Sequence, residues 1–111
     1  MDIQAKEIQA LPSWHPSPEV VATQKAKHKH LCLVDVPEVE QAFLFRLADR
    51  KTLSAVATIA AKDPVEAAYI MVVNTLVWGD KSALEDTRTF AAVSEQVERA
   101  NEPRVATLKN L

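Results

Sequence analysis

The chain has 111 residues, of which 13 are Lys or Arg and 15 are Asp or Glu, so its formal net charge is −2. This length predicts one domain that buries roughly 65% of its unfolded surface. The balanced charge argues against a protein that binds nucleic acid by broad phosphate neutralisation. The single cysteine, Cys32, excludes an intramolecular disulfide, and no run approaches the ~20 apolar residues of a membrane span.

Residues 1–17 are expected to form a flexible N-terminal lead, and residues 18–111 a single α+β domain. A short helical pattern over residues 3–11 is broken by three prolines that follow it closely. The lead lacks the continuous apolar core of a signal peptide, so we expect a cytoplasmic protein. The first helix is predicted at about 18–27, because Ser17 can cap it and Pro18 suits its first position.

Two apolar runs, 31–36 and 42–47, predict an antiparallel β-hairpin over about residues 30–47. In the second run, alternation places Phe43, Phe45 and Leu47 on one face, which we expect to be the inner one. An isolated hairpin is marginal in water, so helices or further strands must cover it.

Two helices are predicted next, at about 50–62 and 64–78. Asp49 caps the first, and Asp63 with Pro64 begins the second. Gly79 offers the left-handed turn that ends the second helix. That helix carries a wide apolar stripe expected to be buried, formed by Val65, Ala68, Tyr69, Val72, Val73, Leu76 and Val77.

The last helix is predicted at about 87–110, starting from Asp86 or Thr87, with Phe90, Val93 and Val97 on its inner side. Pro103 should bend or interrupt it before an apolar line resumes at Val105, Leu108 and Leu111. The predicted fold class is therefore α+β, mainly helical, with one hairpin packed against three or four helices.

Catalytic chemistry is not indicated by the sequence. A single glycine excludes Gly-rich phosphate loops and a nucleophile elbow, and no Ser, His and Asp grouping stands out. The carboxylates Asp80, Glu85 and Asp86 are interpreted as capping residues. We expect no enzyme and no cofactor.

His28, His30 and Cys32 would share one face of a strand, as the ligands of a metal site would, and His15 could be a fourth ligand. Zinc motifs usually bring paired ligands from two segments, whereas these three come from one. We therefore interpret the run as a basic helix end that leads into a strand, with Cys32 as a small hydrophobic residue, and predict no metal.

A family resemblance rests on several short motifs in chain order: Lys25-Ala26-Lys27-His28, the hairpin, Asp49-Arg50-Lys51-Thr52-Leu53-Ser54, Lys62-Asp63-Pro64, Asn74 with Trp78-Gly79-Asp80, and Leu108-Lys109-Asn110-Leu111. Over roughly residues 18–111, the chain resembles small tail assembly chaperones encoded in the tail gene clusters of phages and prophages. The resemblance implies a protein of the bacterial host cytoplasm that binds the tape measure protein until tail tube subunits polymerise around it.

The residues predicted to bind a partner are Trp78, Val105, Leu108 and Leu111. Trp78 has two readings, a buried closing group of the core or an exposed anchor. The hairpin edge and the C-terminal apolar line are each candidates for a client surface or a homo-oligomer contact. The alternative functions are a small helical adaptor and a minor structural tail protein; neither reading includes nucleic acid or membrane as a partner.

Overall fold

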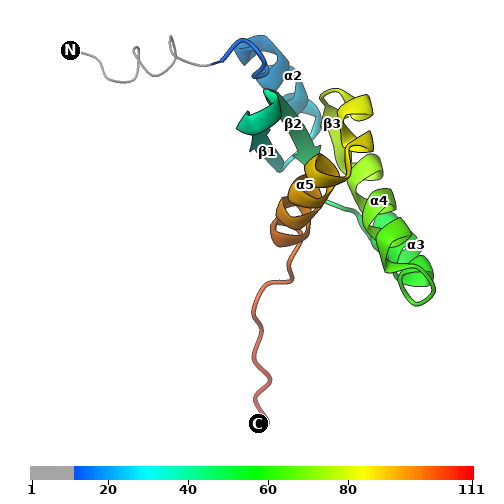
Figure 1. Cartoon of the computed structure of the whole chain (residues 1–111). Coiled ribbons are helices and arrows are strands. Elements are labelled where there is room, and N and C mark those ends of the chain that lie inside the picture. Colours follow the sequence, from blue (N-terminus) through cyan, green and yellow to red (C-terminus); the bar gives the residue numbers. More distant parts are fainter. Residues whose placement is uncertain (1–11) are drawn as a thin grey trace.

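The computed structural model describes residues 12–111 and confirms the predicted α+β fold (Figure 1). The expected helical pattern over residues 3–11 lies outside the described residues. The elements in order are α2 (Pro18–Lys27), β1 (Leu31–Val36), the 3₁₀ turn η1 (Pro37–Val39), β2 (Gln41–Arg46), α3 (Arg50–Ala60), α4 (Pro64–Thr75), β3 (Leu76–Trp78), the 3₁₀ turn η2 (Lys81–Glu85) and α5 (Thr87–Ala100).

The sheet is antiparallel, with the strand order β1-β2-β3. The predicted hairpin is present: β1 and β2 pair from Leu31 opposite Arg46 to Val36 opposite Gln41. Glu40 closes the turn between them in the left-handed conformation, with φ 51°. The third strand, β3, is short and was not predicted.

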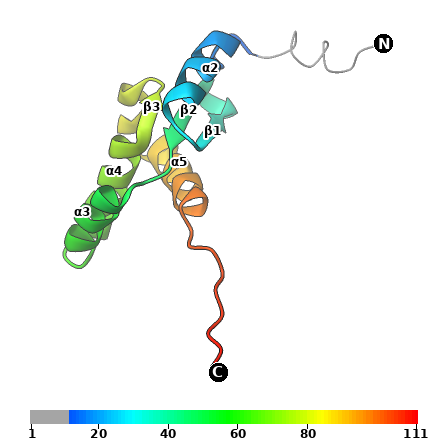
Figure 2. The ribbon, with the colours of Figure 1, turned by 180° about the vertical axis from the view of Figure 1, so that it is seen from behind.

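Both faces of the central strand β2 are buried. Phe43 and Phe45 join the core cluster with Val93 and Val97 of α5, which confirms the aromatic face as an inner one. Leu44 points to the other face and is also buried. The ribbon is seen with α5 in front of the sheet in Figure 1 and with α2 in front in Figure 2, so the sheet lies between these helices.

The segment just before α2 also contacts the sheet. The imidazole Nε2 of His15 lies 3.0 Å from the carboxylate Oδ1 of Asp35, on β1. Pro16, between His15 and the helix cap, is buried. The described part of the predicted lead is thus held against the domain, while residues 1–11 are outside the described residues.

Four helices begin where the sequence indicated. In each, the carboxylate or hydroxyl oxygen of the N-cap residue accepts a hydrogen bond from the backbone N–H three residues later. These caps are Ser17, Asp49, Asp63 and Asp86.

The predicted helix over 64–78 is wrong at its end, because α4 stops at Thr75. The next residues pair with β2 instead: Leu76 lies opposite Phe45, and Trp78 opposite Leu44. Gly79 then turns the chain with φ 132°. It is a turn residue as predicted, but it follows the strand β3 and not the helix α4. Pairing with a distant strand overrides the local helical pattern here.

The predicted helix over 87–110 is also wrong at its end, because α5 stops at Ala100. The amide of the Asn101 side chain donates to the carbonyl of Val97 at 2.8 Å, and Pro103 follows two residues later. Residues 102–111, here called the C-terminal segment, have no regular secondary structure and run away from the body (Figures 1 and 2).

Helices α3 and α4 pack side by side and project from the sheet as an arm (residues 50–75). The apolar stripe of α4 was expected to be wholly buried, and this is wrong for its first half: Val65 is 71% exposed and Tyr69 is exposed as well, whereas Val72 is buried. The arm and the C-terminal segment fit a Cα radius of gyration of 16.5 Å, against about 13 Å for a compact domain of this length.

Candidate interaction surfaces

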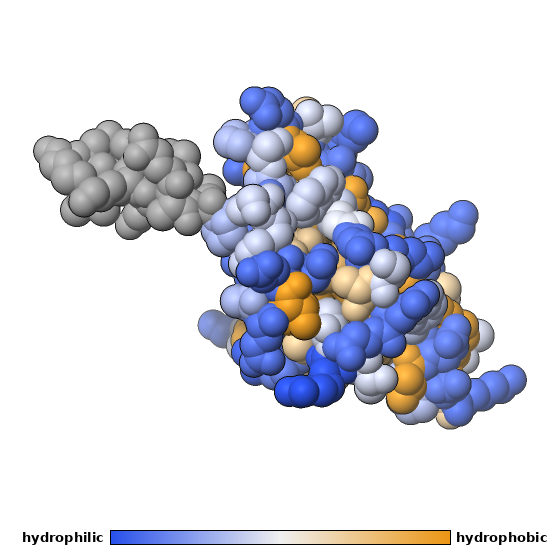
Figure 3. All heavy atoms as spheres, turned by 45° about the horizontal axis from the view of Figure 1, so that its top comes forward, coloured by the Kyte–Doolittle hydropathy of each residue, from blue (hydrophilic) through white to orange (hydrophobic). Residues whose placement is uncertain are grey.

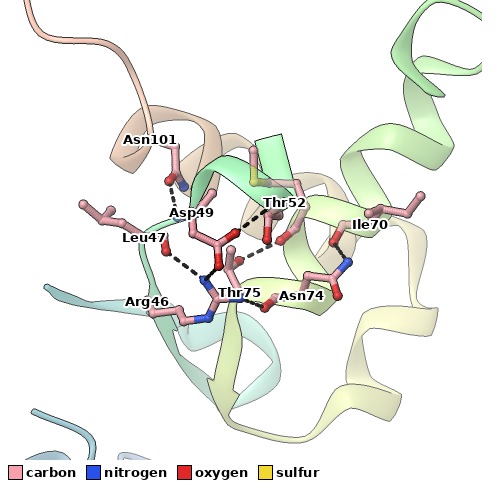
Figure 4. Close-up of polar contacts among 10 residues, drawn as sticks. Arg46, Leu47, Asp49, Thr52, Ile70, Asn74, Thr75 and Asn101 are labelled. Atoms are coloured by element: carbon pink, nitrogen blue, oxygen red, sulfur yellow. Dashed lines mark hydrogen bonds and ion pairs between the residues drawn. The ribbon is translucent and has the colours of Figure 1, made fainter. Parts of the chain in front are cut away.

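A polar network fixes the base of the arm to the sheet (Figure 4). The guanidinium of Arg46, at the end of β2, donates to the carbonyl of Asn74 at 2.7 Å and to that of Leu47 at 3.0 Å. It also lies 3.9 Å from the carboxylate of Asp49, the cap of α3. The arm is therefore held at both its entry and its exit.

Asn101 joins the end of α5 to the same region. Its side-chain oxygen accepts a hydrogen bond of 2.8 Å from the backbone N–H of Ala48, between β2 and α3. Because the amide of Asn101 also donates to Val97, one side chain ends α5 and ties it to the base of the arm. The C-terminal segment thus starts from a fixed point.

Two of the three carboxylates singled out in the sequence, Asp80 and Asp86, act as caps, whereas Glu85 is the last residue of η2 and caps no helix. Asp80 accepts hydrogen bonds from the N–H and hydroxyl of Ser82. The hydroxyl and the N–H of Thr89 hold the pKa of Asp86 below its usual value. The backbone N–H of Thr52, followed by its hydroxyl, likewise lowers the pKa of Asp49. These shifts come from helix starts and supply no proton-transfer pair.

The histidines are placed apart by the fold. His15 contacts Asp35, whereas His28 and His30 line a shallow groove of about 550 Å³ with Lys27, Lys29 and Arg46. Among residues 12–111, no three His, Cys, Asp or Glu side chains gather as metal ligands would. Cys32 is half-buried on β1.

Trp78, the first predicted partner-binding residue, lies on the edge strand β3 and is half-buried. Its register partner is Leu44, whose side chain is buried. Trp78 is therefore neither fully buried in the core nor a fully exposed anchor: it packs at the sheet edge, and part of its surface is open to solvent.

The other predicted partner-binding residues lie in the C-terminal segment. Val105 is 96% exposed and Leu108 93%, and Leu111 is fully exposed. On the face drawn in Figure 3, hydrophobic residues of the body show as separate orange groups between hydrophilic ones. Three fully exposed aliphatic side chains on one short segment are the largest departure from burial in the described chain.

A groove beside the edge of β1 was not identified from the sequence. Two adjoining hollows of about 290 and 730 Å³ share Asp35, Val36 and Ala92, and run between β1 with η1 and the outer face of α5. The sequence did indicate the hairpin edge as incompletely satisfied, but the opposite wall comes from α5, some fifty residues later, and no local pattern reports that pairing.

No helix formed by residues 12–111 combines the length and the apolar character needed to cross a bilayer. Comparison with known proteins gives no match to a family model, to a curated protein or to a solved structure.

Proposed function

We propose that the chain is a binding protein that keeps an aggregation-prone partner in solution, as a phage tail assembly chaperone does for the tape measure protein. The observation that carries this proposal is the C-terminal segment, whose side chains Val105, Leu108 and Leu111 are exposed at the end of a fixed helix. The place of action in this proposal is the cytoplasm of a bacterial host.

Magnitudes indicate what kind of partner suits this segment. Burying three aliphatic side chains stabilises a complex by about 5–9 kcal/mol, at about 1.5–3 kcal/mol each. Ordering an extended segment opposes this by about 1–2 kcal/mol per residue, or about 8–16 kcal/mol over residues 104–111, which offsets most or all of the gain. One copy therefore binds weakly. A long partner that binds many copies in a row fits this balance when neighbouring copies also contact each other, because the second contact of a linked pair is effectively intramolecular.

The experiment first reads the neighbouring genes for a long helix-rich protein, the tape measure protein that the proposal requires, and then co-expresses that client with the chain. The soluble fraction of that client is compared for the full chain, the chain lacking residues 104–111, and a full-length variant in which Val105, Leu108 and Leu111 are all serine. A chain with Thr107→Ala and Asn110→Ala is the matched control, since it keeps the three aliphatic residues.

We expect the truncated chain and the serine variant to lose most of the soluble client and the control to retain it. Client solubility that is unchanged in both would refute the role of the segment. Mass spectrometry of mature particles gives a second test. A chaperone is absent from them, so finding the chain there in stoichiometric amounts would favour the structural alternative instead.

A further inference from the structure

Among residues 12–111, no strand pairs with the outer edge of β1. In the order β1-β2-β3, β1 pairs only with β2 among the described strands. About half of the backbone N–H and C=O groups of an edge strand point away from its neighbour and can pair with another strand. Leu33, in the middle of β1, is 47% exposed. The edge thus offers both backbone hydrogen bonds and apolar contact.

The groove beside this edge is acidic. Its two hollows are lined by Asp35, Glu38, Asp86 and Glu95, against a single cation, Arg88. The formal charge of these five side chains is −3, and it is −2 when Arg99, whose guanidinium lies 2.8 Å from Glu95, is included. The imidazole of His15 contacts Asp35 as well. An extended segment with basic side chains would therefore fit the groove by charge.

The C-terminal segment of this chain has the matching properties. Its charged side chains are Glu102, Arg104 and Lys109, so the part from residue 104 to residue 111 has only basic ones, and all residues of the segment are exposed. Eight extended residues span about 26 Å, and the six residues of β1 about 20 Å, at roughly 3.3 Å per residue. The segment is thus long enough to pair along all of β1 and reach η1.

A second copy is the natural source of this strand. In its own copy the segment leaves α5 at Asn101, which is hydrogen-bonded to Ala48, and runs away from the sheet (Figures 1 and 2). Two copies that exchange segments form two such contacts at once, in a closed two-fold arrangement. The edge is then paired, and the aliphatic side chains divide between the two faces of the added strand, with Val105 and Leu111 on one face and Leu108 on the other.

We propose that the C-terminal segment of a second copy adds as a strand to the outer edge of β1, over the acidic groove. One part of this inference rests on the proposed function: the exchanged dimer keeps the client-binding segment covered, and a client frees the segment by competing with the edge of β1 for it. The dimer itself depends only on the edge, the groove and the segment.

The test is a charge exchange measured by sedimentation velocity. One variant carries Glu38→Lys and Glu95→Lys in the groove, and the other carries Arg104→Glu and Lys109→Glu in the segment. All four side chains are exposed, so both variants should fold, which circular dichroism checks. We expect each variant alone to self-associate at least about tenfold more weakly than the wild type, and an equal mixture of the two to restore the dimer.

The restored dimer follows from the pairing of opposite charges in both contacts of the mixed pair. The matched control for the segment variant is Lys51→Glu with Lys62→Glu on the arm, which makes the same change of net charge and should leave the dimer intact. Raising the salt from about 0.05 to 0.5 M should weaken the wild-type dimer, because it screens exposed charges. A wild-type chain that is monomeric, or charge variants that dimerise like the wild type, would overturn the proposal.

Storage is tested separately by adding a soluble fragment of the client to the wild-type dimer. Dissociation supports competition for the segment. If the dimer obeys the charge exchange but the client stays soluble without residues 104–111, the exchanged dimer stands and the proposed client role falls. If client solubility needs the segment while no dimer forms, the proposed function stands and this inference falls.

Discussion

Replacing Gly79 by alanine should destabilise the fold strongly. Gly79 has φ 132°, a backbone conformation that residues with a side chain rarely adopt. An alanine held in this conformation is strained by about 1–3 kcal/mol. A Cβ there would lie 2.7 Å from the ring atom Cδ1 of Phe43 and 3.0 Å from the carbonyl oxygen of Ala42. Since Phe43 is fully buried, its ring cannot move away freely, and overpacking adds about 1–3 kcal/mol.

Urea unfolding followed by circular dichroism measures this loss. The total is about 2–6 kcal/mol, and with central values of about 4 kcal/mol and a urea dependence of about 2 kcal/mol per M the midpoint should fall by about 2 M. Lys81→Ala, in the exposed turn that follows, is the control and should stay within about 0.5 kcal/mol. A Gly79→Ala midpoint equal to that of the wild type would refute the reasoning.

A double-mutant cycle separates the two causes. Phe43→Leu removes the ring that the new methyl group would strike, so the loss from Gly79→Ala should be smaller in that background. If the clash contributes nothing, the two losses add, and only the backbone conformation of Gly79 explains the effect.

Three further outcomes are expected. Asn101→Ala should lower the free energy of unfolding by about 1–3 kcal/mol, because the half-buried N–H of Ala48 loses its acceptor; urea unfolding checks it, and an unchanged midpoint would contradict it. Asp86→Asn should keep its cap at neutral pH, since Asn caps as well as Asp. The folded-state pKa of Asp86 lies below its usual value. The stability that its carboxylate contributes is therefore present above about pH 4 and is lost as the pH falls through the folded-state pKa. When the free energy of unfolding is measured between about pH 2 and 7, it should fall less steeply toward low pH in Asp86→Asn than in the wild type. Val65→Asp should leave the melting temperature almost unchanged whereas Val72→Asp should abolish folding, and equal effects would mean that the arm is packed differently.

Helix starts were predictable from the sequence because each is decided within one turn of the chain. Asp49, Asp63 and Asp86 each cap their own helix through a backbone N–H three residues later. The hairpin was predictable for a similar reason, because its two strands are separated by a short turn. Signals that lie within one turn or one hairpin depend less on tertiary context than the signals for helix ends do.

Helix ends and exposed surfaces were not predictable in the same way. The end of α4 depends on the pairing of Trp78 with Leu44, more than thirty residues earlier. The exposure of Val65 depends on the arm leaving the body, although the spacing of the stripe is that of a buried helix. In the C-terminal segment, Val105, Leu108 and Leu111 keep a helical spacing without forming a helix, because Asn101 and Pro103 end α5 before them.

The same limit applies to the candidate surfaces. The four predicted partner-binding residues were chosen for aromatic or aliphatic character at the edges of predicted elements, and all four keep some exposed surface. The acidic groove was missed because its walls, β1 and α5, meet only in the folded chain.

The place of the arm in the topology has a consequence for how its reach can change. The arm is inserted between β2 and β3, which are neighbours in the sheet, so its entry and exit lie side by side. Residues added in pairs of helical turns around positions 61–63 would move its tip outward by about 1.5 Å per residue in each helix. The strands and the Arg46 network at its base would keep their contacts. The length of the arm is therefore an adjustable dimension of this fold, independent of the core that supports it.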